Sequence, residues 1–324
     1  MRGHRLIGFV VLPVAGLVFM SLSVARDLTL EDRVKAQEAI ERVYYSHQIG
    51  ATKPFEDAAP RETLEKKVNT YLEQTIALEK FWKTRVTAEM LRAELERMAR
   101  QTRMPERLRE LFAALGQDTF LIQETLVRQV LVDRLAHNFF AYDRTIHAEA
   151  LEEAEAAREA LVSGVLDLRS SHPRRSDVEV RRKNQDAGEG PGLKRAEPPR
   201  DVTGGGDEQL VSLDAEAFAA WREQYSAGLE QIPPISDERD AYVVRVLLEE
   251  EPDHARAAVF TFPKMSYDVW WQSFGPEFDV RGIPAVAGAS DLRLLAVGSD
   301  CPPYDAWSSI QAEAPSPRGD GASA

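Results

Sequence analysis

This chain has almost no cysteine, no pair of histidines at a metal-binding spacing and no excess of positive charge. Each of these features excludes a class of site. Cys301 is the single cysteine in 324 residues, so no disulfide can form within the chain and a zinc site built on several cysteines is excluded. The 6 histidines include no pair at the HxxxH or HExxH spacing that places two metal ligands on one helix face. The sequence therefore predicts no metal site and no bound cofactor.

The charge balance argues against a nucleic-acid surface. Asp and Glu outnumber Lys and Arg by 53 to 40, which gives a net charge of −13. Binding a polyanion requires clustered cations, and the basic run from Arg169 to Lys183 has the composition of a solvated linker. The glycines from Gly204 to Gly206 are not followed by the lysine and hydroxyl residue of a phosphate loop. No nucleic-acid partner is expected.

The first residues are typical of an export signal. Arg2 and Arg5 precede an apolar run from Leu6 to Met20, and Ser23 to Ala25 offers the small residues that a signal peptidase requires. The apolar run is shorter than the roughly 20 residues of a stable membrane span. The sequence therefore predicts a signal peptide at 1–25 and a periplasmic or secreted protein, and an uncleaved signal would be its one membrane contact.

Helical periodicity dominates the chain as far as residue 165. Thr29, Thr87 and Asp118 are candidate N-caps, Pro105 suits a first helical turn, and Gly116 suits a helix end. With the spacing of the apolar residues, these signals predict helices at Leu30–His47, Glu62–Trp82, Thr87–Arg100, Pro105–Leu115, Thr119–Tyr142 and Ile146–Leu161. The helix at 119–142 has the broadest apolar face, so we expect it at the centre of a helical domain spanning 27–165.

The composition changes after residue 170. The segment 170–209 is rich in proline, glycine and charge, with too few apolar residues to offset the entropy of ordering, and predicts a disordered linker. A small α+β segment at 210–274 follows, and an irregular tail at 275–324, so the fold class is mainly α. The elements expected here are a helix at Asp214–Gly228, strands at Ala241–Leu248, Ala257–Phe262 and Leu292–Val297, and a helix at Tyr267–Phe274.

The helices between Val86 and Phe140 resemble the N-terminal domain of SurA-type periplasmic chaperones. The residues that carry the likeness are Val86 to Glu89, Glu94 to Arg100, Pro105 to Gly116, Glu124 to Leu131, and Leu135. Together with Leu30 to Trp82, the likeness covers about half of the mature chain. The resemblance implies a protein that holds unfolded or extended segments of exported proteins. By the same resemblance, we expect the block from Phe218 to Trp271 to return and complete the helical domain.

The chain after Asp143 resembles, in part, the parvulin prolyl isomerase domain that often follows such a helical domain. The likeness rests on His147, Glu152 to Glu155, Leu161 to Gly164, Phe218, Leu229, Pro233 to Ser236, and Tyr242 to Val244. In a parvulin the last strand usually carries a second active-site histidine, where this chain has Val243. Because a valine cannot form the hydrogen bonds of an imidazole, we interpret the region as a degenerate or absent parvulin domain. The sequence favours a non-enzyme, with His147 as the candidate catalytic residue of the alternative, a peptidyl-prolyl isomerase.

Aromatic side chains at helix ends are candidates for holding a peptide, although each also fits a core position. They are Phe81, Trp82, Phe112, Phe139 and Phe140. A third hypothesis, a non-catalytic scaffold of a truncated propeller-bearing protein, rests on the extreme C-terminus. That segment resembles the opening of a kelch-type blade at Asp305, Trp307, Pro315, Pro317 and Arg318, and a single blade cannot bury its own face.

Overall fold

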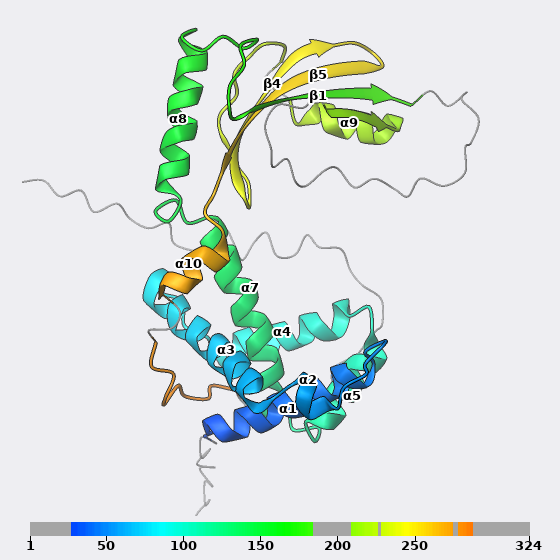
Figure 1. Ribbon diagram of the computed structural model, residues 1–324, viewed down its shortest axis with the longest axis vertical. Coiled ribbons are helices and arrows are strands. Elements are labelled where there is room, and N and C mark those ends of the chain that lie inside the picture. The colour runs from blue at the N-terminus through cyan, green and yellow to red at the C-terminus, as the bar shows by residue number, and fades with distance from the viewer. Residues whose placement is uncertain (1–26, 184–208, 226–227, 275–277, 288–324) are drawn as a thin grey trace, which may run out of the picture.

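A computed structural model describes residues 27–183, 209–225, 228–274 and 278–287 (Figure 1). Helices account for about 53% of the structure, beside one mixed five-stranded sheet, in agreement with the predicted mainly α class. The predicted signal peptide, the strand at Leu292–Val297 and the kelch-like residues lie outside the described residues. None of the helices in the described ranges combines the length and the apolar character that crossing a bilayer requires.

The N-terminal helices form one unit, and their ends follow the predicted capping signals. The elements are α1 (Leu30–Ser46), α2 (Phe55–Ala58), α3 (Arg61–Trp82), α4 (Ala88–Gln101), α5 (Pro105–Ala114), α6 (Thr119–Ile122), η1 (Gln123–Val127) and α7 (Arg128–Ala141). Thr29 and Asp32 form a reciprocal capping box at α1, and Thr87 and Asp118 accept N–H groups at the starts of α4 and α6. Gly116 takes the left-handed conformation, φ 67°, that ends α5.

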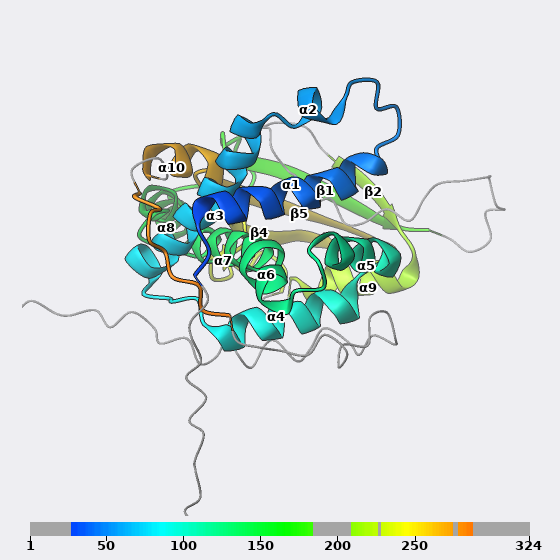
Figure 2. The same cartoon turned by 90° about the horizontal axis from the view of Figure 1, so that it is seen from below.

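The long helix predicted at 119–142 is the centre of this unit, as its broad apolar face indicates. It consists of α6, η1 and α7 in direct succession, and η1 is a π-helical turn. Viewed along α7, α1 and α4 lie on opposite sides of it (Figure 2). One hydrophobic core joins α1, α3, α4, α5 and this central helix, and includes Ile40, Val68, Leu91, Leu111 and Val132. We call residues 27–142 with 264–287 the helical unit.

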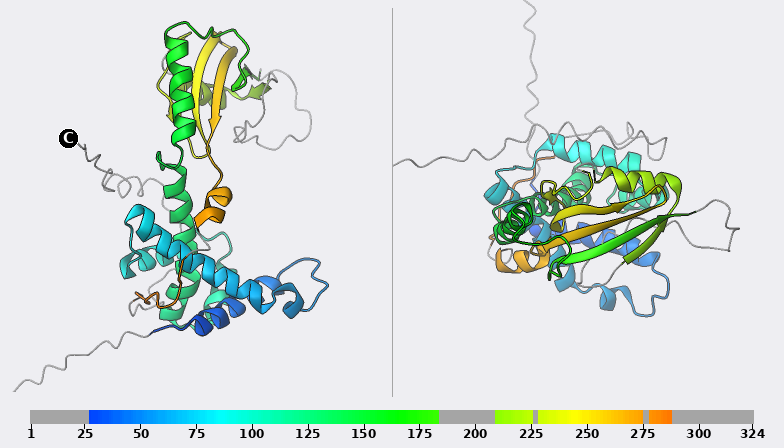
Figure 3. Two further views of the ribbon diagram at one scale, coloured as in Figure 1. Left: turned by 60° about the vertical axis from the view of Figure 1, so that its left-hand side comes forward. Right: turned by 90° about the horizontal axis from the view of Figure 1, so that it is seen from above.

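The remaining elements form a second unit, the sheet unit, at 148–263. It contains α8 (Ala148–Val162), β1 (Arg175–Arg182), β2 (Gln209–Leu213), α9 (Ala215–Glu223), β3 (Ser236–Asp237), β4 (Ala241–Glu250) and β5 (His254–Pro263). The strand order is β2-β1-β5-β4-β3, with β1 parallel to β2 and the other pairs antiparallel. Helix α8 covers one face and α9 the other (Figure 3). The strands predicted at Ala241–Leu248 and Ala257–Phe262 are confirmed as β4 and β5, which form an antiparallel hairpin.

Successive side chains of β4 and β5 pack alternately against α8 and α9, the helices on the two faces of the sheet. Tyr242, Val244 and Phe260 pack against α8, whereas Val243 and Val259 pack against α9. Successive residues of a strand point to opposite faces, so a sheet covered on both sides reads as a continuous apolar run. The sequence of β4 and β5 therefore predicted strands without showing which residue faces which helix.

Two boundaries differ from the prediction. Strand β1 lies within the segment 170–209 that was expected to be a disordered linker, and it is an inner strand between β2 and β5. Its Val178 and Val180 face α9, and charged residues occupy the alternate positions, so its average composition concealed its period of two. Helix α8 was assigned to the helical domain at 27–165, but its apolar face packs on β4 and β5.

The chain returns to the helical unit after β5. Helix α10 (Tyr267–Phe274) lies against α7, and Val280, Ile283, Val286 and Ala287 pack on the helical core. Figure 1 shows α10 and this segment, in orange, beside α3 and α7. The SurA resemblance implied such a return for the block from Phe218 to Trp271. Tyr267 and Trp270 do pack on the helical unit, whereas Phe218 and strands β4 and β5 belong to the sheet unit. Trp221 also stays in the sheet unit beside Phe218 and Tyr225.

Candidate functional site

Four of the five predicted peptide-binding aromatic residues meet where α3, α7 and α10 converge. Phe81 and Trp82 end α3, and Phe139 and Phe140 lie near the end of α7. Trp82 stacks on Phe139 with ring centroids 5.7 Å apart and an interplanar angle of 20°. We call this group, together with the α10 rings described next, the aromatic cluster. The fifth candidate, Phe112, is elsewhere: it lies on α5, buried in the helical core.

Helix α10 covers the aromatic cluster with its own rings. The Trp270 ring lies 5.3 Å from Phe81, 5.6 Å from Trp82 and 5.3 Å from Phe140. Tyr267 stacks on His137 at 3.8 Å, and burial raises the pKa of the Tyr267 phenol well above its usual range. The apolar site that the sequence predicted for a foreign peptide is thus filled by a segment of the same chain.

A second contact holds the segment Phe278–Ala287 by its backbone. The N–H groups of Val286 and Ala287 donate to Oε1 of Glu124 at 2.7 and 2.8 Å. Glu124 lies in η1 and is 0% exposed. Its carboxylate also accepts from the buried guanidinium groups of Arg128, at 2.9 Å, and Arg33, at 3.4 Å. An ionised carboxylate accepts hydrogen bonds and cannot donate them. The Glu124 carboxylate is therefore a suitable acceptor for backbone N–H groups.

The surroundings keep Glu124 ionised. Burial alone would raise its pKa, but the Arg128 guanidinium and the N–H groups of Ala287 and Val286 outweigh it and lower the pKa. Two buried arginines face one buried carboxylate, and Arg33 uses its second Nη to donate to the Glu124 carbonyl at 2.8 Å. The sequence offered no direct signal for this site, because a glutamate within an amphipathic helix is usually a solvated residue.

Glu124 lies in the π-helical turn η1, which faces the core. All five of its residues, Gln123 to Val127, are buried. A π-turn inserts one extra residue into an α-helix and shifts the face that the following residues present, and such turns are frequent at functional sites. The side-chain amide of Gln123, next to Glu124, has no hydrogen-bond partner among the described residues. Polar groups therefore lie at the centre of an otherwise apolar unit.

Lys264 joins the two units. Its side chain is 1% exposed, and its Nζ donates to the Ala141 carbonyl at 2.6 Å, the Glu238 carbonyl at 2.7 Å and the Asp237 carboxylate at 2.5 Å. The Tyr242 ring lies 4.5 Å from the same Nζ. Because these partners come from both units, the ammonium group fixes the end of α7 to the β3–β4 edge of the sheet.

His147, the candidate catalytic residue, lies beside this joint as the N-cap residue of α8. It is 2% exposed, and its Nε2 donates to the Phe140 carbonyl at 2.9 Å. Its Nδ1 has no partner among the described residues, and burial lowers the pKa of the imidazole. Val243, at the position of the second parvulin histidine, is buried against α9. The geometry around His147 fits a packing role between α7 and α8.

The lowered pKa of His147 predicts a loss of stability on acidification. The unfolded chain binds a proton near the usual pKa of 6.5, whereas the folded chain binds it only at lower pH. Stability should therefore be unaffected well above pH 6.5 and fall as the pH drops from there toward the lowered pKa. His137 has the opposite shift, because Asp133 raises its pKa, so the contribution of His147 must be isolated by substitution.

The test compares the native protein with His147→Gln, which keeps an N–H donor for the Phe140 carbonyl. Urea unfolding at pH 7.5 and 5.5 should show a larger loss in the native protein than in the variant. Equal losses in the two proteins would contradict the prediction.

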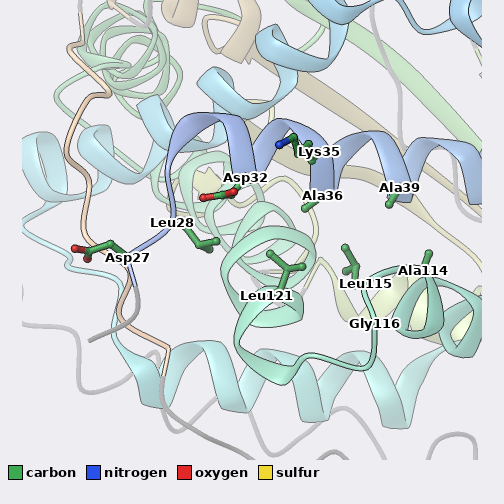
Figure 4. Close-up of a pocket in the computed structure, with 10 residues that line it drawn as sticks. All are labelled: Asp27, Leu28, Asp32, Lys35, Ala36, Ala39, Ala114, Leu115, Gly116 and Leu121. Carbon is green, nitrogen blue, oxygen red and sulfur yellow. The ribbon is translucent and has the colours of Figure 1, made fainter. Parts of the chain in front are cut away.

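A separate hollow lies between α1 and the turn after α5 (Figure 4). It has a volume of about 350 Å³ and is lined largely by aliphatic groups, including Ala36, Leu115 and Leu121. Asp32 at its edge is engaged in the cap of α1. Within the described ranges, no group of three or more acidic, histidine or cysteine side chains is placed to hold a metal ion.

Comparison with known proteins leaves the chain without an assigned family. No protein-family model matches it, and neither does any curated protein or solved structure.

Proposed function

We propose that this protein is an exported, SurA-like holder of extended polypeptide segments, acting without catalysis. The observation that carries the proposal is the mode in which the helical unit holds residues 278–287. Four apolar side chains of this segment pack on the helical core, and two backbone N–H groups reach Glu124. This combination of side-chain pockets and main-chain hydrogen bonds is how proteins bind extended peptides.

The aromatic cluster supports the same proposal. Large rigid rings provide contact area at low cost in conformational entropy, and they tolerate many apolar partners. The predicted export signal, Arg2 and Arg5 before the run from Leu6 to Met20, supports a periplasmic or secreted location, where unfolded exported proteins are the available clients. The isomerase alternative has no comparable support, because His147 is buried and its would-be partner position is Val243.

The proposal predicts that the protein suppresses the aggregation of an unfolded outer-membrane protein. Light scattering after dilution of the client from urea should fall when the protein is present at about equimolar concentration. Phe81→Ser, in the partly exposed part of the aromatic cluster, should weaken the suppression. Tyr44→Ser is the matched control, since Tyr44 is 46% exposed on α1 and outside the cluster. Unchanged scattering at a severalfold molar excess would refute the proposed function.

A further inference from the structure

The segment Phe278–Ala287 has no regular secondary structure, turns at Arg281 and Gly282, and contacts the helical unit in a defined pattern. Val280, Ile283, Val286 and Ala287 are partly buried against the helical core. Counted from Val280, the apolar positions are the first, fourth, seventh and eighth. Gly282 takes φ +80° in the turn between the first two contacts, and that conformation favours glycine. The ring of Phe278 lies 6.4 Å from Phe81 and 4.9 Å from the Lys80 ammonium.

Glu124 recognises the backbone of this segment, whatever its side chains. One carboxylate oxygen accepts two consecutive N–H groups, and hydrogen bonds to an ionised acceptor are stronger than neutral ones. Proline lacks the N–H group, so it is excluded from the two positions that contact Glu124. Pro284 lies two residues before the first of these positions, where no N–H group is needed for Glu124. The site thus selects apolar side chains at some positions and a free backbone N–H at two others.

The contacts of the segment are modest for a permanent part of a core. Its apolar side chains are all partly exposed, and Arg281 pairs with Asp279 two residues away, with both side chains largely exposed. A covalent tether gives such a segment an effective concentration on the order of millimolar. Weak intrinsic affinity is therefore enough to keep it in place, and a foreign segment of the same chemistry must compete with it.

We infer that the groove around Glu124, meaning the surface of the helical core that residues 280–287 cover, binds client segments. These segments have apolar residues at positions one, four, seven and eight and unblocked N–H groups at the last two. The chain's own residues 280–287 occupy the groove until such a client displaces them. This inference rests on the proposed function, to which it adds the chemistry of the segment that is bound. The ligand is a stretch of polypeptide with apolar side chains at those positions and no proline at the two positions that face Glu124.

The test displaces residues 278–287 from the groove by substitution and then measures the binding of a peptide with the same sequence. In the full chain, the double variant Val286→Pro, Ala287→Pro removes both N–H donors and leaves Glu124 unchanged. Ala285→Pro is the matched control, because its N–H is not one of the two that reach Glu124. The probe is a fluorescein-labelled peptide with the sequence of residues 278–287, and its binding is followed by fluorescence anisotropy. We expect the double variant to bind the probe about tenfold or more tightly than the native protein and the control do.

A second probe tests the role of the backbone. The same peptide, N-methylated at the positions of Val286 and Ala287, should bind the double variant about tenfold or more weakly than the unmodified peptide does. Equal binding of the two peptides would overturn the assignment to Glu124. Equal binding of the unmodified peptide to the native and double-variant proteins would overturn displacement. Ile283→Ser, which releases the segment through its apolar contact, replaces the double variant if circular dichroism shows that the latter is unfolded.

The combined results of the aggregation and peptide-binding assays distinguish a failure of this inference from a failure of the proposed function. If the native protein suppresses client aggregation but the released variant binds no peptide, the inference fails and the proposed function stands. If the released variant binds peptide as expected but no form suppresses aggregation, the proposed function fails while the groove's peptide chemistry stands. Light scattering that shows a dimer of the released variant, with no peptide binding, would assign the groove to a second copy of the chain and overturn the inference.

Discussion

Replacing Glu124 by alanine is expected to lower the free energy of unfolding by about 3–5 kcal/mol, the usual cost of removing one partner of a buried ion pair. Glu124 is 0% exposed, and its partners Arg33 and Arg128 are 2% and 1% exposed. Without the carboxylate, two guanidinium groups remain buried without a counter-charge. The N–H groups of Val286 and Ala287 also lose their acceptor.

Urea unfolding followed by circular dichroism at neutral pH measures this effect. Glu96→Ala is the matched control, because Glu96 forms an ion pair on the surface of α4 with Arg100, and exposed pairs contribute about 0–1 kcal/mol. Glu124→Gln should lie between the two, since an amide keeps one acceptor oxygen for the backbone but loses the charge. A Glu124→Ala variant as stable as Glu96→Ala would contradict the buried arrangement.

Replacing Trp270 by alanine is expected to cost about 3–5 kcal/mol as well, the range for a large aromatic residue removed from a core. Trp270 is 4% exposed and lies within 6 Å of the Phe81, Trp82 and Phe140 rings. Its ring contacts residues of both α3 and α7. Its loss should therefore release α10 and increase cleavage by trypsin at Arg281, in addition to lowering stability.

The neighbouring residue provides the control for this prediction. Trp271 is only partly buried and contacts Tyr267 and Phe278, both C-terminal to the sheet. Trp271→Ala should therefore have a clearly smaller effect on both the urea midpoint and the rate of tryptic cleavage. Equal effects of the two substitutions would show that Trp270 does not anchor α10.

The two predictions concern one property of the helical unit, which is completed by residues more than a hundred positions away. Trp270 fills the aromatic cluster, and the backbone of Val286 and Ala287 reaches Glu124. Lys264 lies between the sheet and these contacts and is bonded to both units. Release of the segment from the groove therefore does not require the two units to separate.

Local signals in the sequence were sufficient for the long helices, but not for the short helix α2, where no helix was predicted. Caps at Thr29, Thr87 and Asp118 and the left-handed Gly116 act within one helical turn, so they can be recognised without knowledge of the fold. The β-branched runs of β4 and β5 are similarly local. The strand β1 was missed because the charge of its surroundings outweighed its alternation, although the pattern of Val178 and Val180 among charged residues was present as a signal.

The site was only partly accessible to the same reasoning. Phe81, Trp82, Phe139 and Phe140 were recognised as candidates because aromatic residues at helix ends either pack or bind. Their meeting with Trp270, and the burial of Glu124, depend on contacts between distant segments, which periodicity does not encode. An ideal helical projection places Glu124 on the face of Arg128 and Leu131, but it does not show that Arg33 and a returning backbone will meet the carboxylate there.

The sequence by itself determined the long helices, most of their ends, two central strands and the aromatic side chains available for binding. These features follow from spacing, capping and side-chain type within a few residues. Only the tertiary structure decided that α8 belongs to the sheet, that α10 covers the aromatic cluster, and that Glu124 holds a returning backbone. Those features depend on which surfaces meet. Which surfaces meet is determined by the burial of whole apolar faces and by the pairing of charges far apart in the chain.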